Sequence, residues 1–242
     1  MRGVQCGGNT AILKSKNMDY ELLNCETADG NNRMALFSIN QVNYKDIIKY
    51  QDTDIFQDQT TFLCGESGCG KSTLLKLLNG VVSAGSGTIT YKGKPVEEYD
   101  PTKLRREVLL VGQSVYLFDG TIRENFQEYY AYRDLSLISD EKIREYLKLC
   151  AADFPLTEPC KNMSGGERQR IYIAICMSLM PKVLMMDEPT SALDEKNSWI
   201  VMENIKEFCT RKGITLIVVS HNTRLAEAFA DRTITFCGGG CR

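Results

Sequence analysis

The chain has 242 residues, of which 43% are apolar and 25% charged, a composition typical of a folded globular domain that excludes general disorder. The 29 lysines and arginines are offset by 31 aspartates and glutamates, giving a formal net charge of -2. No global basic field is therefore available to hold nucleic acid, and a nucleic-acid partner is disfavoured.

The first 34 residues show no sustained hydrophobic period, and they contain glycine- and asparagine-rich clusters. We interpret residues 1–34 as a variable or partly disordered arm in front of one domain that covers residues 35–242. The arm lacks the apolar stretch of a secretory signal, so we expect the protein to stay inside the cell.

Short strand-like runs open the domain. They cover residues 36–42, a piece around 47–55, and 60–64, and together they predict a small sheet region that leads into a core strand.

A glycine loop follows the last of these runs. Residues 65–72, GESGCGKS, fit the pattern G-x-x-x-x-G-K-[ST] between a predicted strand and a predicted helix. Glycines let backbone N–H groups surround phosphate oxygens, and the helix start adds a positive partial charge. We expect Lys71 to reach the terminal phosphates and Ser72 to offer its hydroxyl to magnesium.

Strands and helices alternate after the loop. The predicted helices cover 71–79, much of 119–149, 164–180 and 199–211, and the predicted strands cover 86–92, 108–111, 183–186 and 214–219. Apolar strands separated by helices imply a mostly parallel sheet covered on both faces, with a helical subdomain over about 114–165. The most apolar stretch, 171–186, is interrupted by polar residues and is too short to span a membrane.

Two carboxylates follow the apolar run 183–186. Asp187 and Glu188 come at the carboxyl end of a predicted parallel strand, where ligands gather in such sheets. Asp187 is placed to hold magnesium through water, and Glu188 to polarise the attacking water as a general base. Taken alone, the pair is equally compatible with an ordinary strand-end turn before Pro189.

A second possible anion site begins the predicted helix 164–180. Ser164, Gly165 and Gly166 open that helix, and a helix start attracts anions. In isolation Ser164 would be a helix cap, with Glu167 completing a capping box. Together with the glycine loop, however, it predicts two phosphate-binding loops in one domain.

The segments 164–170, SGGERQR, and 187–194, DEPTSALD, resemble those of the ABC ATPase family. The resemblance covers about residues 35–236, and the family's order is kept by Lys71, Gln113, Ser164, Asp187, Asp194 and His221. It implies a P-loop NTPase fold of the ABC ATPase type, with a mostly parallel sheet, a small antiparallel β subdomain and a helical subdomain. It also implies an ATP sandwich, in which the glycine loop of one copy and the Ser-Gly-Gly loop of a second copy hold one nucleotide.

The resemblance gives roles to two residues that carry little signal alone. In the family, a glutamine placed like Gln113 contacts magnesium and water and relays contact with the membrane subunit, and a histidine placed like His221 contacts the γ-phosphate. A lone histidine is more often structural. The position of His221 after the predicted strand 214–219 favours the family role.

The residue that stacks on adenine has two candidates. The family places an aromatic ring in the early sheet region, where Tyr44 stands, and Tyr50 is its rival. An ordinary half-buried strand tyrosine is an equally good interpretation of Tyr44.

The full set of expected site residues follows from these arguments. The expected catalytic residues are Glu188, His221, Gln113 and Lys71, and the expected magnesium residues are Ser72, Gln113 and Asp187. The expected ATP-binding residues are Tyr44, Gly65, Glu66, Ser67, Gly68, Cys69, Gly70, Lys71, Ser72, Thr73, Ser164, Gly165, Gly166 and Asp194.

The resemblance further implies a motor subunit of an ABC transporter. Its partners would be ATP, a second copy of itself and a separate transmembrane permease that holds it on the inner face of the cell membrane. Alternatives are a soluble ABC ATPase in translation or DNA maintenance, which usually carries tandem cassettes or a long coiled coil, a degenerate non-hydrolysing cassette, and a P-loop kinase. Residues 117–125, LFDGTIREN, resemble the exporter form of this segment, and the overall pattern is similar to bacterial iron-export ATPases.

Overall fold

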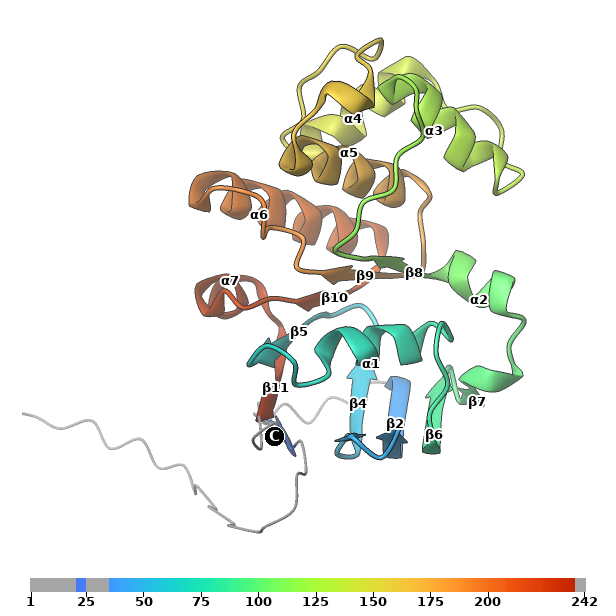
Figure 1. The fold of residues 1–242 in the computed structure, drawn as a ribbon, viewed down its shortest axis with the longest axis vertical. Helices are drawn as coiled ribbons and strands as arrows, with labels where there is room; N and C mark the ends of the chain where they lie inside the picture. Colours follow the sequence, from blue (N-terminus) through green and yellow to red (C-terminus); the bar gives the residue numbers. More distant parts are fainter. Residues whose placement is uncertain (1–20, 25–34, 238–242) are drawn as a thin grey trace, which may run out of the picture.

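The computed structural model describes residues 21–24 and 35–237, which form two sheets and the helices that cover them (Figure 1). The strands are β1 (Glu21–Asn24), β2 (Ala35–Tyr44), β3 (Ile48–Lys49), β4 (Thr53–Phe56), β5 (Thr60–Gly65), β6 (Ser86–Tyr91), β7 (Lys94–Pro95), β8 (Val108–Val111), β9 (Val183–Asp187), β10 (Thr215–Val219) and β11 (Arg232–Cys237). The helices are α1 (Lys71–Leu78), α2 (Pro101–Glu107), α3 (Ile122–Ala131), α4 (Asp140–Leu149), α5 (Gly165–Ser178), α6 (Glu195–Lys212) and α7 (Thr223–Phe229).

The larger sheet has the strand order β1-β11-β5-β10-β9-β8. Its strands β11, β5, β10, β9 and β8 are parallel, and β1 pairs with β11 in the antiparallel sense. All five residues of β9 are buried, as expected for a strand covered on both faces. The fold class predicted from the sequence, a mostly parallel sheet with a small antiparallel sheet and a helical region, is confirmed.

Two apolar cores lie on opposite faces of this sheet, because alternate residues of a strand point to opposite sides. Leu184 and Met186 pack with side chains from α3 to α7. Val183 and Met185 pack with α1 and the smaller sheet. In Figure 1, α1 lies between the larger sheet and β2, β4 and β6, whereas α3 and α4 lie beyond α5 at the opposite end of the molecule.

The smaller sheet is antiparallel. Its order is β3-β2-β6-β7, with β4 paired to β2. The strand-like runs expected at 36–42 and around 47–55 form its strands β2, β3 and β4. The short strand β3 lies close to the glycine loop, since Ile48 lines the same cleft as that loop.

Part of the predicted N-terminal arm lies outside the described residues, namely 1–20 and 25–34. The described part of the arm, Glu21–Asn24, forms β1 at the edge of the larger sheet. Among the described helices, none combines the length and apolar character needed to cross a membrane.

Three helices differ from the sequence prediction. Helix α6 begins at Glu195 and not at residue 199, because Asp194 accepts a hydrogen bond from the Asn197 N–H and caps a polar first turn that shows no apolar period. Helices α2 and α7 have seven residues each, too few for the hydrophobic repeat to show, and they depend on the caps Asp100 and Asn222.

Candidate functional site

The glycine loop joins β5 to α1 and is held by its own lysine. Lys71 is buried, and its Nζ donates hydrogen bonds to the carbonyl oxygens of Gly65 at 2.9 Å and Glu66 at 2.6 Å. Gly70 has a φ of 97° at the start of α1, and a Cβ there would lie 3.0 Å from the Ile48 Cγ2 atom. Glycine is therefore required at this position on grounds of both backbone conformation and space.

The two carboxylates stand at the end of β9, next to β10. Glu188 has a positive φ of 54°, and its N–H donates to the carbonyl oxygen of Val219 at 3.0 Å. Asp187 Oδ1 is buried and has no hydrogen-bond partner within the described part of the chain. A buried carboxylate oxygen without a partner is costly, which indicates that a ligand belongs there.

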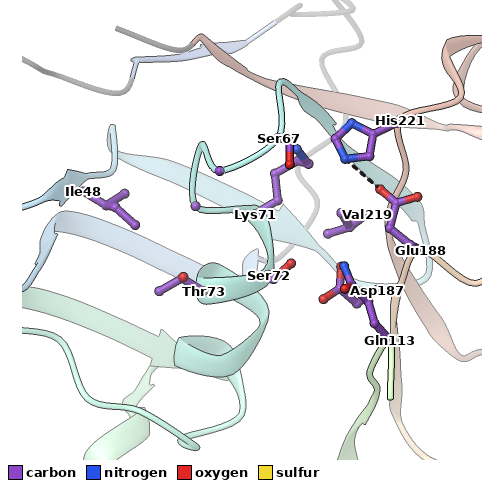
Figure 2. Close-up of a pocket in the computed structure, with 12 residues that line it drawn as sticks. Ile48, Ser67, Lys71, Ser72, Thr73, Gln113, Asp187, Glu188, Val219 and His221 are labelled. Atoms are coloured by element: carbon purple, nitrogen blue, oxygen red, sulfur yellow. Dashed lines mark ion pairs between the residues drawn. The ribbon is translucent and has the colours of Figure 1, made fainter. Parts of the chain in front are cut away.

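The His221 and Glu188 side chains contact each other on the same side of the cleft, beyond the ends of the neighbouring strands β10 and β9. His221 Nε2 lies 3.3 Å from Glu188 Oε1 (Figure 2). Burial raises the pKa of Glu188, and the neighbouring His221 partly opposes this rise. The carboxyl group therefore binds a proton more readily than an exposed glutamate does, which suits a general base.

One open cleft collects most of the residues expected in the site. Figure 2 shows Ser72 pointing from α1 toward Asp187 and Gln113, with Lys71, the first residue of α1, above it. The cleft is lined by Ile48, Ser67, Gly68, Gly70, Lys71, Ser72, Thr73, Gln113, Asp187, Glu188, Val219 and His221. The cleft thus brings a lysine, three hydroxyls, two carboxylates, an amide and a histidine together at the carboxyl ends of parallel strands.

Several expected residues do not line this cleft: Tyr44, Gly65, Glu66, Cys69, Ser164, Gly165, Gly166 and Asp194. Ser164 is exposed and caps α5, in a capping box with Glu167 whose Oε2 accepts from the Ser164 N–H at 2.8 Å. Gly165 is exposed, and a Cβ there would meet nothing within 4 Å. The loop expected to bind a second anion is therefore exposed to solvent at Ser164 and Gly165 and does not line the cleft.

The two aromatic candidates for adenine stacking differ in how deeply they are buried. Tyr50 is buried, and its hydroxyl donates to the carbonyl oxygen of Gly70 at 2.9 Å. Tyr44 is half-buried at the end of β2. Ile48, which lines the cleft beside the loop, was not identified from the sequence, because a single isoleucine in a two-residue strand gives no distinctive signal.

Comparison with known proteins gives the family. The model of the ABC transporter family matches residues 48–191. Multidrug resistance protein 1 of Entamoeba histolytica is 36% identical over 80% of this chain, which spans 15% of that relative's length. The probable iron export ATP-binding protein FetA of Escherichia coli is 35% identical over 72% of this chain and 76% of its own length.

Among solved structures, cbiO1 from Clostridium perfringens, part of the ABC transporter complex cbiONQ, is similar with a TM-score of 0.72. The similarity covers 84% of each chain at 26% identity. The family model covers more than half of this chain, and the fold agrees with that of a solved cassette. The chain therefore belongs to the ABC transporter family, as an ATP-binding cassette.

Proposed function

We propose that this chain binds ATP, hydrolyses it to ADP and phosphate, and drives an ABC transporter whose membrane-spanning part is a separate polypeptide. The observation that carries the proposal is the division of phosphate-binding elements between two places on one chain. Lys71 and Glu188 share one cleft, whereas the Ser164 loop lies outside it and is exposed. A site of this kind is complete only when a second copy supplies its Ser164 loop.

The cleft fits a magnesium ion. Asp187 Oδ1 is buried without a hydrogen-bond partner among the described residues, and the Ser72 and Gln113 side chains face the same space. Carboxylate, hydroxyl and amide oxygens are ligands that magnesium prefers. We assign Asp187, Ser72 and Gln113 to hold it. Magnesium held there would supply positive charge that offsets the negative charge of the ATP phosphates.

Lys71 binds the terminal phosphates in this proposal. Its ammonium group donates to the carbonyl oxygens of Gly65 and Glu66, so the lysine already points into the loop before ATP binds. Phosphate oxygens are stronger acceptors than neutral carbonyls, and they would take over these donors when ATP enters. The backbone N–H groups at the start of α1 add further donors to the same phosphates.

Glu188 and His221 act on the attacking water. The Glu188 carboxylate accepts a proton from that water as its oxygen bonds to the γ-phosphorus, and its burial favours proton uptake. The bond from the γ-phosphorus to the bridging oxygen breaks in the same step, so ADP leaves with that oxygen. His221 Nε2 lies 3.3 Å from Glu188 Oε1 and keeps the carboxylate in place. We assign the same imidazole to contact the γ-phosphate, as the family resemblance implies. Tyr44 remains the proposed adenine-stacking residue, since the Tyr50 hydroxyl is engaged with Gly70.

The membrane partner is assigned to a second polypeptide. FetA, of which this chain covers 76% at 35% identity, supports an ATP-binding protein of comparable length, whereas the multidrug relative is much longer. In this arrangement the cassette sits on the cytoplasmic face of the membrane through the permease, and the permease selects the cargo.

Phosphate release tests the proposal. Glu188→Gln keeps the shape of the side chain but removes the base, so turnover should fall by about 10²- to 10⁴-fold. ATP should still raise the unfolding temperature of the variant as it does for the wild type, which shows that binding is intact. Wild-type turnover in Glu188→Gln would mean that another group activates the water.

A further inference from the structure

Glu188 has a backbone conformation that its surroundings must hold in place. Its φ of 54° lies in the left-handed region, which a residue with a Cβ rarely adopts. Such a conformation persists only where neighbouring groups fix it. It sets the direction in which the Glu188 side chain leaves the end of β9, so whatever fixes the backbone also fixes the carboxylate.

Hydrogen bonds from three sources fix this residue. The N–H of Glu188 donates to Val219 on β10 at 3.0 Å. Its carbonyl oxygen accepts from the N–H and the Oγ of Ser191, at 3.2 and 3.0 Å, which are local bonds within the turn. It also accepts from Gln169 Nε2 at 3.2 Å, and this bond reaches the turn from another element, α5.

Gln169 is built into the helix that begins with the second anion loop. It is only 4% exposed and lies in the second turn of α5, which Ser164 caps. Gly166, three residues earlier, faces the same side of the helix. A Cβ on Gly166 would lie 2.8 Å from the Ala192 carbonyl oxygen, so α5 packs directly on the turn that follows Glu188.

We infer that Gln169 is a positioning residue, which holds the Glu188 backbone and ties the place of the base in one cleft to the place of the Ser164 loop. The Gln169 bond and the Gly166 contact attach α5 to the 188–192 turn at two points one helical turn apart. This inference rests on the proposed function, in which the Ser164 loop contacts the nucleotide of a second copy. Docking of that copy and the readiness of Glu188 are then linked inside one chain.

Replacing the amide of Gln169 tests this role. Gln169→Met keeps the length of the side chain but removes the donor, so kcat for ATP should fall by about three- to tenfold, the loss expected for one hydrogen bond. KM for ATP should stay at the wild-type value, because the groups that bind the phosphates are untouched. Gln169→Glu places a carboxylate oxygen against the Glu188 carbonyl, and kcat should fall further.

A second measurement separates positioning from damage to α5. In a Glu188→Gln background, which cannot turn over ATP, Gln169→Met should still form the ATP-dependent dimer, because the Ser164 loop is unchanged. The matched control is Tyr130→Phe, which removes a 2.9 Å hydrogen bond from Tyr130 to the Ser178 carbonyl at the far end of α5 and should leave kcat unchanged.

Each outcome bears on the inference. Wild-type kcat in both Gln169 variants would overturn it, and so would a fall in kcat that comes with an equal loss of the dimer. If Gln169→Met does not fold, as judged by its thermal unfolding, Gln169→Glu carries the test. A wild-type chain that does not hydrolyse ATP would overturn the proposed function itself, which is a separate result.

Discussion

Replacing Lys71 should weaken ATP binding and so remove most of the stabilisation that ATP gives to the folded protein. In the structure Lys71 Nζ makes hydrogen bonds of 2.9 and 2.6 Å to the carbonyls of Gly65 and Glu66, and ATP would redirect these donors to its phosphates. A hydrogen bond to a charged group contributes about 1.5–3 kcal/mol. Loss of about 2.7 kcal/mol of binding free energy in Lys71→Met would weaken the affinity for ATP about 100-fold.

The expected change in Tm follows from the binding of ATP to the folded protein, which stabilises that state. ATP at about 100 times its Kd stabilises the wild type by about 2.7 kcal/mol. For a domain of this length, 1 kcal/mol corresponds to about 2–4 °C in Tm, so ATP should raise the Tm of the wild type by about 5–10 °C. A 100-fold weaker site is half-filled at the same concentration, and the gain falls to about 0.4 kcal/mol, or about 1 °C.

Thermal unfolding with and without magnesium-ATP measures this difference. The matched control is Lys76→Met, which removes an exposed lysine from the same helix and should keep the full ATP-induced shift. A folded Lys71→Met protein that gained as much Tm from ATP as the wild type would refute the assignment of the lysine to the phosphates.

Two further predictions concern the framework of the site. Gly70→Ala should lower the free energy of unfolding by more than Gly68→Ala in urea titrations without nucleotide. Both glycines have positive φ, but only the Gly70 Cβ would crowd Ile48, at 3.0 Å. Asn125→Leu should destabilise the fold by about 2–4 kcal/mol, because the buried amide accepts from the Phe118 N–H at 2.8 Å and donates to backbone carbonyls. Equal losses in the two glycine variants, or an Asn125→Leu midpoint equal to the wild type, would contradict these readings.

Much of the fold could be predicted from the sequence, because its signals are local. The strand, loop and helix around Lys71 follow from glycines and leucines at fixed spacing, and most of the buried strand β9 follows from the uninterrupted apolar run 183–186. Elements that show no apolar pattern could not be predicted from the sequence. The polar first turn of α6 and the short helix α7 depend on the caps Asp194 and Asn222.

The site also has features that the sequence indicates and features that it does not. Residue types and order indicated Glu188 and His221, and the structure brings these two side chains to 3.3 Å. Sequence spacing carries no information on the positive φ of Glu188, nor on the hydrogen bond from Gln169, which joins residues 19 positions apart in the chain. Such features arise from packing between elements and need coordinates.

The ATP-dependent dimer tests the central claim most directly, since the claim is that two copies share each nucleotide. Size exclusion with light scattering should give the mass of a monomer for Glu188→Gln without nucleotide and of a dimer with ATP. Ser164→Arg in the same background places bulk and positive charge at the exposed loop that we propose contacts the γ-phosphate of the second copy. That double variant should bind ATP and remain monomeric, and a double variant that still dimerised with ATP would contradict the shared site.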